Sequence, residues 1–304
     1  MNKSDISTWK NYAPTILLLV ILLIAFLLFL PTGKLTTKGL PALNIVNGIA
    51  LIIIGLLAGL LGGLIGTGGC SVMLPAIHFW LGYPAPIAVG TTLFAVIFTA
   101  ISGGYGHLVR KNLDVKATLW VGSSGIGGVI VGSYLFRLLT SHVSLLGLIL
   151  GLAFLWPAAR MIWEGLFKAK RPQATGNSIP GPVWGWAVMG LLVGILTGVV
   201  GLGGGYALVP SFIYLFGAPV YITMGTSLAT MIPLAAVGGG IKLAQGFVAL
   251  GPGLILSVGV VIGAQIGAAI IKRFKPTTLK LIFGLYFLYV SIKFITAFFG
   301  LKVW

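Results

Sequence analysis

The chain is built from long apolar runs that are separated by short polar segments. A membrane-spanning helix needs about 20 apolar residues, and nine runs approach or exceed that length. Two shorter apolar pieces, 70–82 and 205–217, follow clusters of glycine. We expect each of them to pair with the run before it as a broken or re-entrant helix. The predicted spans are 14–30, 43–65, 86–106, 116–139, 143–163, 183–200, 220–241, 248–271 and 278–300.

Composition supports a membrane protein. Hydrophobic residues make up 58% of the 304 residues and charged residues only 7%, whereas soluble domains carry about 25% charged residues. The apolar runs are continuous and do not alternate as the strands of a membrane barrel would. We therefore predict an all-α polytopic membrane protein. The formal charge of +16 is explained by orientation signals and lipid head groups, so we expect the lipid bilayer and not nucleic acid as the partner.

The distribution of Lys and Arg orients the spans, because cytoplasmic loops are enriched in both residues. Lys3 and Lys10 place the N-terminus in the cytoplasm, and we expect a multi-pass protein of the plasma membrane. The basic segments predicted inside are 107–116, 167–173 and 272–280, and those predicted outside are 31–39, 137–142 and 244–253.

The chain contains an internal repeat. A shift of 135 residues superposes 59–160 on 194–295 without a gap, so that "GLLGGLIGTGGCSVMLP" meets "GILTGVVGLGGGYALVP". The shift also aligns "GTTL" (90–93) with "GTSL" (225–228). We therefore divide the chain into an N-terminal segment with one extra helix (1–42), a first repeat (43–163), a cytoplasmic linker (164–182) and a second repeat (183–304).

Charges at matching loops predict that the two repeats have opposite orientations. The loop after the third element is basic in the first repeat, with Arg110, Lys111 and Lys116, but has only Lys242 nearby in the second. At the next loop the second repeat carries more basic residues than the first. Inverted repeats with interrupted helices are an architecture of secondary transporters, whose sites lie where the two interrupted elements meet.

The paired glycine-rich segments, each followed by proline and then by G-T-[ST]-L, resemble those of the TauE/SafE sulfite exporter family, also called the toluene sulfonate uptake permease family. The resemblance covers the chain after residue 43. It implies a carrier that exports small sulfur-containing anions, such as sulfite or organosulfonates like sulfoacetate. Cys70 and Thr67 depart from their repeat partners Gly205 and Leu202, which puts two-fold equivalence of the site in doubt.

The predicted substrate site is an anion cradle at the two glycine clusters. A helix that stops there leaves backbone N–H groups without partners, and helix N-termini attract anions. Close helix packing through small residues is the alternative. Hydroxyls that follow each cluster can donate to an anion or bond back to their own helix. The predicted substrate-binding residues are Gly66, Thr67, Gly68, Gly69, Cys70, Thr91, Thr92, Gly201, Gly203, Gly204, Gly205, Thr226 and Ser227.

Three further residues are candidates for coupling or for attracting anions: His78, His107 and Lys242. An interior histidine or a snorkelling side chain is the alternative for each. Trp156 and Tyr206 are candidates for reaching a cavity. We find no paired catalytic groups and no histidines at metal-ligand spacing, so we expect neither an enzyme nor a metal site, and no cofactor.

These features predict an exporter that works by alternating access. A channel-like anion uniporter and a membrane scaffold or assembly subunit without transport are the alternatives. The coupling ion, H⁺ or Na⁺, and a homo-oligomer are left open.

Overall fold

The computed structural model describes residues 3–29, 40–167, 176–270 and 276–301, and no strand occurs in these ranges. The prediction of an all-helical protein is therefore confirmed. Its helices are α1 (Lys3–Phe29), α2 (Ile45–Ile65), α3 (Cys70–Pro75), the π-helical turn η2 (Ala76–Trp80), α4 (Ala85–Val109), α5 (Val115–Leu139), α6 (Val143–Phe167), α7 (Val183–Val200), α8 (Gly205–Tyr214), α9 (Val220–Ala244), α10 (Leu250–Ile270) and α11 (Pro276–Phe298).

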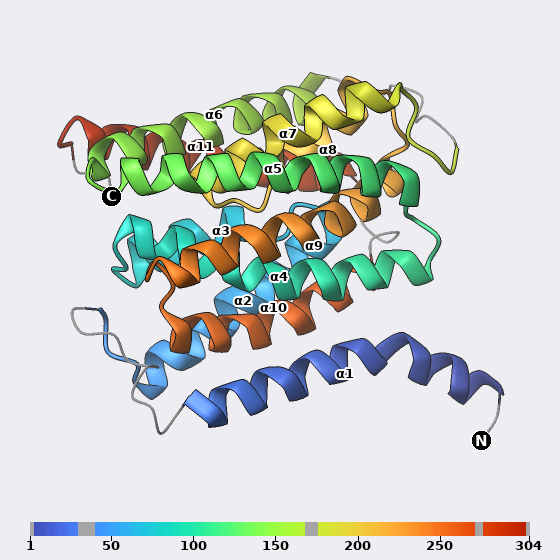
Figure 1. Cartoon of the computed structure of the whole chain (residues 1–304), viewed down its shortest axis with the longest axis horizontal. Coiled ribbons are helices and arrows are strands. Elements are labelled where there is room, and N and C mark those ends of the chain that lie inside the picture. The colour runs from blue at the N-terminus through green and yellow to red at the C-terminus, as the bar shows by residue number, and fades with distance from the viewer. Residues whose placement is uncertain (1–2, 30–39, 168–175, 271–275, 302–304) are drawn as a thin grey trace.

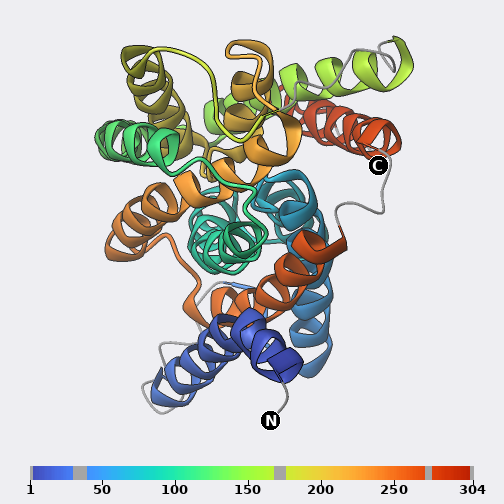
Figure 2. The ribbon, with the colours of Figure 1, turned by 90° about the vertical axis from the view of Figure 1, so that its right-hand side faces the viewer.

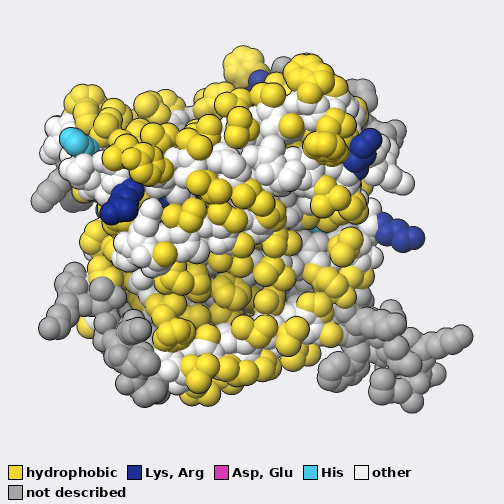
Figure 3. All heavy atoms as spheres, viewed as in Figure 1, with side chains coloured by type: hydrophobic (Ala, Val, Ile, Leu, Met, Phe, Trp, Pro, Cys, Tyr) yellow, Lys and Arg dark blue, Asp and Glu magenta, His cyan; other side chains and the backbone are white. Residues whose placement is uncertain are grey.

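Seven of the helices in the described ranges are long and apolar enough to cross a membrane, namely α2, α4, α5, α6, α7, α9 and α10. Shorter apolar stretches lie in α1 (Ala13–Phe29), in Cys70–Trp80 and in α11 (Gly284–Phe298). Apolar side chains cover most of the face shown in Figure 3, and the few Lys and Arg side chains lie mostly near its two ends. This distribution fits a protein whose sides contact hydrocarbon.

The centre of the molecule is formed by α4 and α9, which pack against each other. The pair α5 and α7 lies on one side of them, and the pair α2 and α10 lies on the other (Figure 1). In Figure 2, α4 is enclosed by the other helices, whereas α1 lies at the outer edge, where it packs on α10 and α4. The helices α6 and α11 pack together beside α5 and α7.

Glycine allows the closest of these helix pairs to form. A Cβ atom added to Gly59 would lie 2.5 Å from the carbonyl oxygen of Val260 in α10, and one added to Gly194 would lie 2.2 Å from the carbonyl oxygen of Gly125 in α5. Gly59 and Gly194 are repeat partners. Small residues therefore bring the backbones into contact, as in many membrane helix pairs.

The helix boundaries follow the repeat seen in the sequence. The bounds of α4 and α9 differ by 135 residues at both ends, and α3 and α8 begin 135 residues apart. Both α4 and α9 extend three residues beyond the predicted ends, 106 and 241. The opposite orientation of the repeats stays a prediction. Three of the basic positions on which it rests, Lys272, Arg273 and Lys275, lie outside the described residues.

Candidate functional site

Two interruptions of the helical backbone form the centre of the candidate site. Between α2 and α3 the chain passes through residues 66–69, and between α7 and α8 it passes through residues 201–204. Glycine is required at three positions in each interruption, because a positive φ angle is unfavourable for residues with a Cβ atom. The φ angles are 79°, 73° and 76° at Gly66, Gly68 and Gly69, and 71°, 71° and 84° at Gly201, Gly203 and Gly204.

The structure brings the two interruptions into contact between α4 and α9. A Cβ atom on Gly205 would lie 2.6 Å from the Cα atom of Thr67. Gly68 and Gly203 both face the side chains of Met231 and Val96. Val96 and Met231 are repeat partners, and neither was predicted as a site residue, because an apolar side chain within a span carries no signal that distinguishes it from its neighbours.

Both interruptions contain backbone N–H groups without a protein acceptor. Within the described part of the chain, the N–H groups of 67–69 and of 202–206 donate to no protein atom. All of these residues except Thr67 are buried. Buried N–H groups of this kind are rare, and they carry partial positive charge near the start of a helix. The arrangement can therefore accept an anion or water without using a charged side chain.

His107 and Lys242 cap the C-terminal ends of the interrupted helices. Nε2 of His107 donates to the carbonyl of Gly63 in α2 (3.0 Å), and Nζ of Lys242 donates to the carbonyl of Gly198 in α7 (2.6 Å). The donors are repeat partners, and so are the acceptors. In an uninterrupted helix these carbonyls would accept from backbone N–H groups four residues later. Nζ of Lys242 also lies 3.7 Å from the centre of the Phe136 ring.

The predicted hydroxyl ligands have different roles. The N–H of Ala249 donates to Thr91 and the N–H of Asp114 donates to Thr226, each over 2.9 Å. The Thr92 hydroxyl bonds back to the carbonyl of Ala88 in its own helix (2.8 Å). Only Ser227 among the four contacts an interruption by a hydrogen bond, which it donates to the carbonyl of Gly66 (2.8 Å).

The two remaining candidates lie in different places. Cys70 is buried, and its sulfur lies 3.6 Å from the position of a Cβ atom on Gly203, so it belongs to the junction of the interruptions. His78 lies on η2, where Nδ1 donates to the carbonyl of Tyr83 (2.7 Å) and the ring stacks on Phe294 of α11. The structure does not bring His78 together with the glycine clusters.

Asp114 is a buried carboxylate that was not predicted as a functional residue. Its two oxygens accept from the N–H of Ala117 (3.1 Å) and from the N–H of Ile179 (2.7 Å). An Asp directly before an apolar helical run is a signal for a helix N-cap, and it would have identified the first contact. Within the described residues, no three His, Cys, Asp or Glu side chains gather as a metal site would require.

The sequence of the chain matches a known family and several of its members. The sequence profile described as "Sulfite exporter TauE/SafE" matches residues 51–294. The probable membrane transporter protein YdhB of Bacillus subtilis is 30% identical over 234 residues, which cover 76% of this chain and 93% of the relative. The probable membrane transporter protein YunE of the same organism is 28% identical over 256 residues, covering 77% and 92%. No solved structure matches the chain significantly.

Proposed function

Because the chain belongs to the sulfite exporter TauE/SafE family of membrane transporters, and not to an enzyme family, we propose that it is a secondary transporter that exports small sulfur-containing anions across the plasma membrane. Sulfite and organosulfonates such as sulfoacetate are the proposed substrates. The observation that carries this proposal is the meeting of two glycine interruptions whose N–H groups, on buried residues apart from Thr67, have no acceptor in the described part of the protein.

The backbone supplies the binding chemistry in this proposal. A sulfite or sulfonate group has several acceptor oxygens, and the N–H groups of 202–206 and 67–69 are donors that need no charged side chain. Donation from fixed backbone groups avoids the large cost of placing an unpaired Lys or Arg in hydrocarbon. In this proposal, alternating access requires that the two interruptions move against Val96 of α4 and Met231 of α9, because both side chains pack on both interruptions.

Reconstituted liposomes test this function. Purified protein should take up labelled sulfite or sulfoacetate with saturable kinetics, and related anions should compete. Flux that rises linearly without saturation would favour the channel-like uniporter instead. Absence of flux, together with absence of a ligand-induced rise in Tm over an anion panel, would favour a scaffold.

Substitution at the interruptions tests the proposed binding site. Gly203→Ala places a Cβ atom 2.6 Å from Cε of Met231 and forces alanine to a φ of 71°, which costs about 1–2 kcal/mol. We expect loss of most flux with normal membrane insertion. Gly240→Ala is the matched control, because Gly240 lies in α9 with no atom within 4 Å of its added Cβ. Wild-type flux and KM in the Gly203 variant would contradict the backbone cradle.

A further inference from the structure

His107 carries a ring nitrogen that the fold leaves without a partner. The side chain is fully buried, and Nε2 donates to the carbonyl of Gly63, so Nε2 must carry the hydrogen of the neutral ring. The other nitrogen, Nδ1, then presents a lone pair, and within the described part of the chain it has no hydrogen-bond partner. Since buried polar atoms usually have a partner, the open lone pair at Nδ1 points to a proton or a water molecule that binds there.

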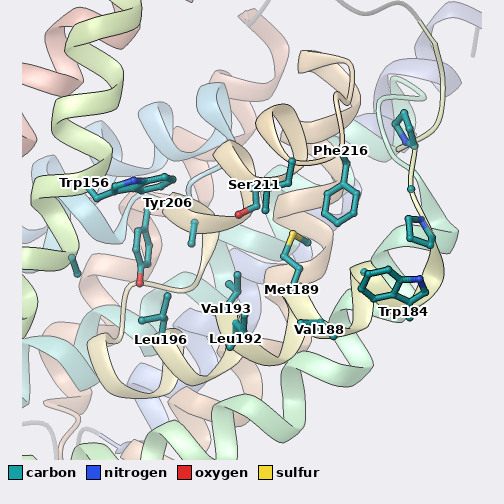
Figure 4. A pocket seen from close by; sticks show the side chains of 17 residues that line it. Trp156, Trp184, Val188, Met189, Leu192, Val193, Leu196, Tyr206, Ser211 and Phe216 are labelled. Atoms are coloured by element: carbon teal, nitrogen blue, oxygen red, sulfur yellow. The ribbon is translucent and has the colours of Figure 1, made fainter.

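The other buried side-chain atoms without a partner are less suited to binding a proton. Within the described residues they include hydroxyl or amide atoms of Thr15, Asn112, Ser133, Thr223, Thr230 and Gln245. Such groups do not take up a proton near neutral pH. The Tyr206 hydroxyl also lacks a partner, but Figure 4 shows it directed toward Leu196 in a cavity of about 820 Å³. That cavity is almost entirely apolar and opens on the outer surface beside Trp184, which is exposed, so hydrocarbon and not water adjoins it.

The imidazole of His107 lies beside the first interruption (66–69). Gly63, whose carbonyl it caps, follows Gly62, and a Cβ atom on Gly62 would lie 3.0 Å from the Cα atom of Gly69. The N–H of Gly69 is one of the unpaired donors. On α9, a Cβ atom on Gly225 would lie 2.9 Å from the Cβ atom of His107. The imidazole and an unpaired N–H group therefore pack on adjacent residues of α2.

The charged groups around His107 are engaged with other partners. Nη1 of Arg110, on the same helix, donates to the carbonyl of Gly106 (2.5 Å), and both oxygens of Asp114 accept from backbone N–H groups. The described side chains of α1, α2 and α10 include no titratable group. The remaining titratable side chains on neighbouring elements make no hydrogen bond to the imidazole and are Cys70, Tyr105, Lys111, Lys116 and Tyr221. Within the described residues His107 forms no ion pair, so a bound anion would supply the counter-charge of a protonated ring.

The second repeat holds a different group at the matching position. Nζ of Lys242 donates to the carbonyl of Gly198 and lies over the Phe136 ring. A neutral and a protonated amine can both make these two contacts, so they do not require a change of proton. The imidazole of His107 differs, because its cap uses one nitrogen and leaves the second as a separate place for a proton.

We propose that His107 is the proton site of the transporter: Nδ1 takes up one H⁺ when the anion binds at the first interruption, and the proton and the anion are carried together. This inference rests on the proposed function, because it presupposes an anion at the interruptions. An N–H bond forms at Nδ1 with a proton from water on the side where the anion binds, and the proton returns to water where the anion leaves.

Electrostatics link the two binding events. The imidazolium places a positive charge close to the anion, and opposite charges attract strongly where water is excluded. Because linkage is reciprocal, the anion raises the affinity for H⁺ by the same factor by which H⁺ raises the affinity for the anion. Histidine suits this role, since its charge ordinarily changes between about pH 5 and 8.

Methanesulfonate uptake into liposomes tests the proton site. This probe stays ionised throughout the pH range and cannot itself carry a proton, whereas bisulfite can. In the wild type, uptake should acidify the lumen, as reported by a trapped pH-sensitive dye, and KM should be at least about fivefold lower at about pH 6 than at about pH 8. His107→Gln keeps an amide N–H for the Gly63 carbonyl but has no group that titrates. We expect its flux to continue without acidification and with a KM that does not depend on pH.

Two further glutamine variants are matched controls. Lys242→Gln replaces the cap of the other interruption, and His142→Gln removes an exposed histidine that bonds to Ser141. Both should retain the acidification and the pH-dependent KM of the wild type. Absence of acidification in the wild type, or equal acidification in His107→Gln, overturns the proposal. Loss of acidification in Lys242→Gln but not in His107→Gln would assign the proton to Lys242 and also overturn it.

Protonation of His107 can be measured without transport. The chain has three histidines, so in protein labelled with ¹⁵N-histidine the signals of His107 are those missing from His107→Gln. In detergent we expect Nδ1 to become protonated at a higher pH when methanesulfonate is present. A His107 ring that stays neutral at about pH 5 with methanesulfonate present overturns the proposal. Flux of methanesulfonate without H⁺ overturns only the role of His107, whereas absence of flux for every anion in the wild type overturns the proposed function.

Discussion

Two buried side chains, His107 and Lys242, show how a single residue compensates for an interrupted helix. Each donates to a carbonyl in the last turn of α2 or α7. The C-terminal end of a helix carries partial negative charge and unpaired carbonyls, so an N–H donor such as Nζ of Lys242 is favourable there. The roles in coupling or anion attraction that the sequence suggests for both residues stay predictions. Their contacts in the structure are those of helix caps.

Removal of the Lys242 amine group should therefore destabilise the C-terminal end of α7. Lys242→Met leaves the buried carbonyl of Gly198 without its donor and removes the contact with Phe136. We expect a loss of about 1–3 kcal/mol in the free energy of unfolding, and a lower Vmax because the second interruption is less well held. Lys242→Gln keeps an N–H donor and should recover part of both. Thermal denaturation in detergent and liposome flux measure the two effects, and an unchanged Tm in Lys242→Met would contradict the cap.

Asp114 connects three parts of the chain through one residue. Its carboxylate caps α5 at Ala117 and binds the N–H of Ile179, which lies in the predicted linker, while its own N–H donates to Thr226 of α9. We expect Asp114→Ala to lower the free energy of unfolding by about 2–4 kcal/mol, from the lost cap and the unpaired N–H of Ile179. Asp114→Asn retains one acceptor oxygen and should lose about half as much. Equal Tm values for the wild type and both variants would show that these contacts do not stabilise the fold.

At the scale of helices, the strongest constraint is the close approach of α5 to α7 and of α2 to α10. Glycines on the facing sides let backbone atoms touch across each pair. In a bilayer, water does not drive helices together, so close packing supplies much of the association energy. The two pairs are related by the repeat, and each joins a helix of one half to a helix of the other.

Adjacent glycines in α5 give a controlled test of this packing. A Cβ atom on Gly128 would lie 2.1 Å from the carbonyl oxygen of Leu191 in α7, whereas one on Gly127 would lie 4.0 Å from the nearest atom, Cδ1 of Leu191. We expect Gly128→Ala to cost about 1–3 kcal/mol because α5 and α7 must separate. Gly127→Ala should stabilise α5 by about 0.5–1 kcal/mol, since glycine weakens a helix interior. The Tm values of the two variants, measured in the same detergent, test these expected differences in stability. Similar Tm values for the two variants would contradict the packing argument.

At the scale of the whole molecule, the two halves are interlocked. The interrupted helix α2 packs on α10, and α7 packs on α5, so neither half buries its own glycine-lined face. The packing of α4 against α9 closes the centre. The division into repeats at 163 and 183 stays a prediction. Within the described residues, α2 and α7 each pack on a helix from the other side of that division.

The local pattern of apolar runs predicted the helices. It also predicted where two of them are interrupted, because closely spaced glycines, such as those around Gly68 and Gly203, weaken a helix. It did not predict which helices pair. The contact of Gly59 with Val260 joins residues about 200 positions apart, and no local periodicity encodes such a pairing. Within the described residues, the buried hydroxyl of Tyr206 has no hydrogen-bond partner. The sequence could not predict this either, because hydrogen-bond partners depend on how the helices pack.

The last prediction concerns the opposite orientation of the two repeats. Val109 and Ala244 end α4 and α9, are exposed, and lie 135 residues apart as repeat partners. Basic residues follow Val109 but not Ala244, so the positive-inside rule places Val109 in the cytoplasm and Ala244 outside. A membrane-impermeant maleimide should therefore label Ala244→Cys in intact cells and Val109→Cys only after permeabilisation. The wild type is the unlabelled control, because Cys70 is the only cysteine and is buried. Labelling of both variants from the same side would mean that the repeats are parallel, and it would contradict the inverted-repeat architecture predicted from the sequence.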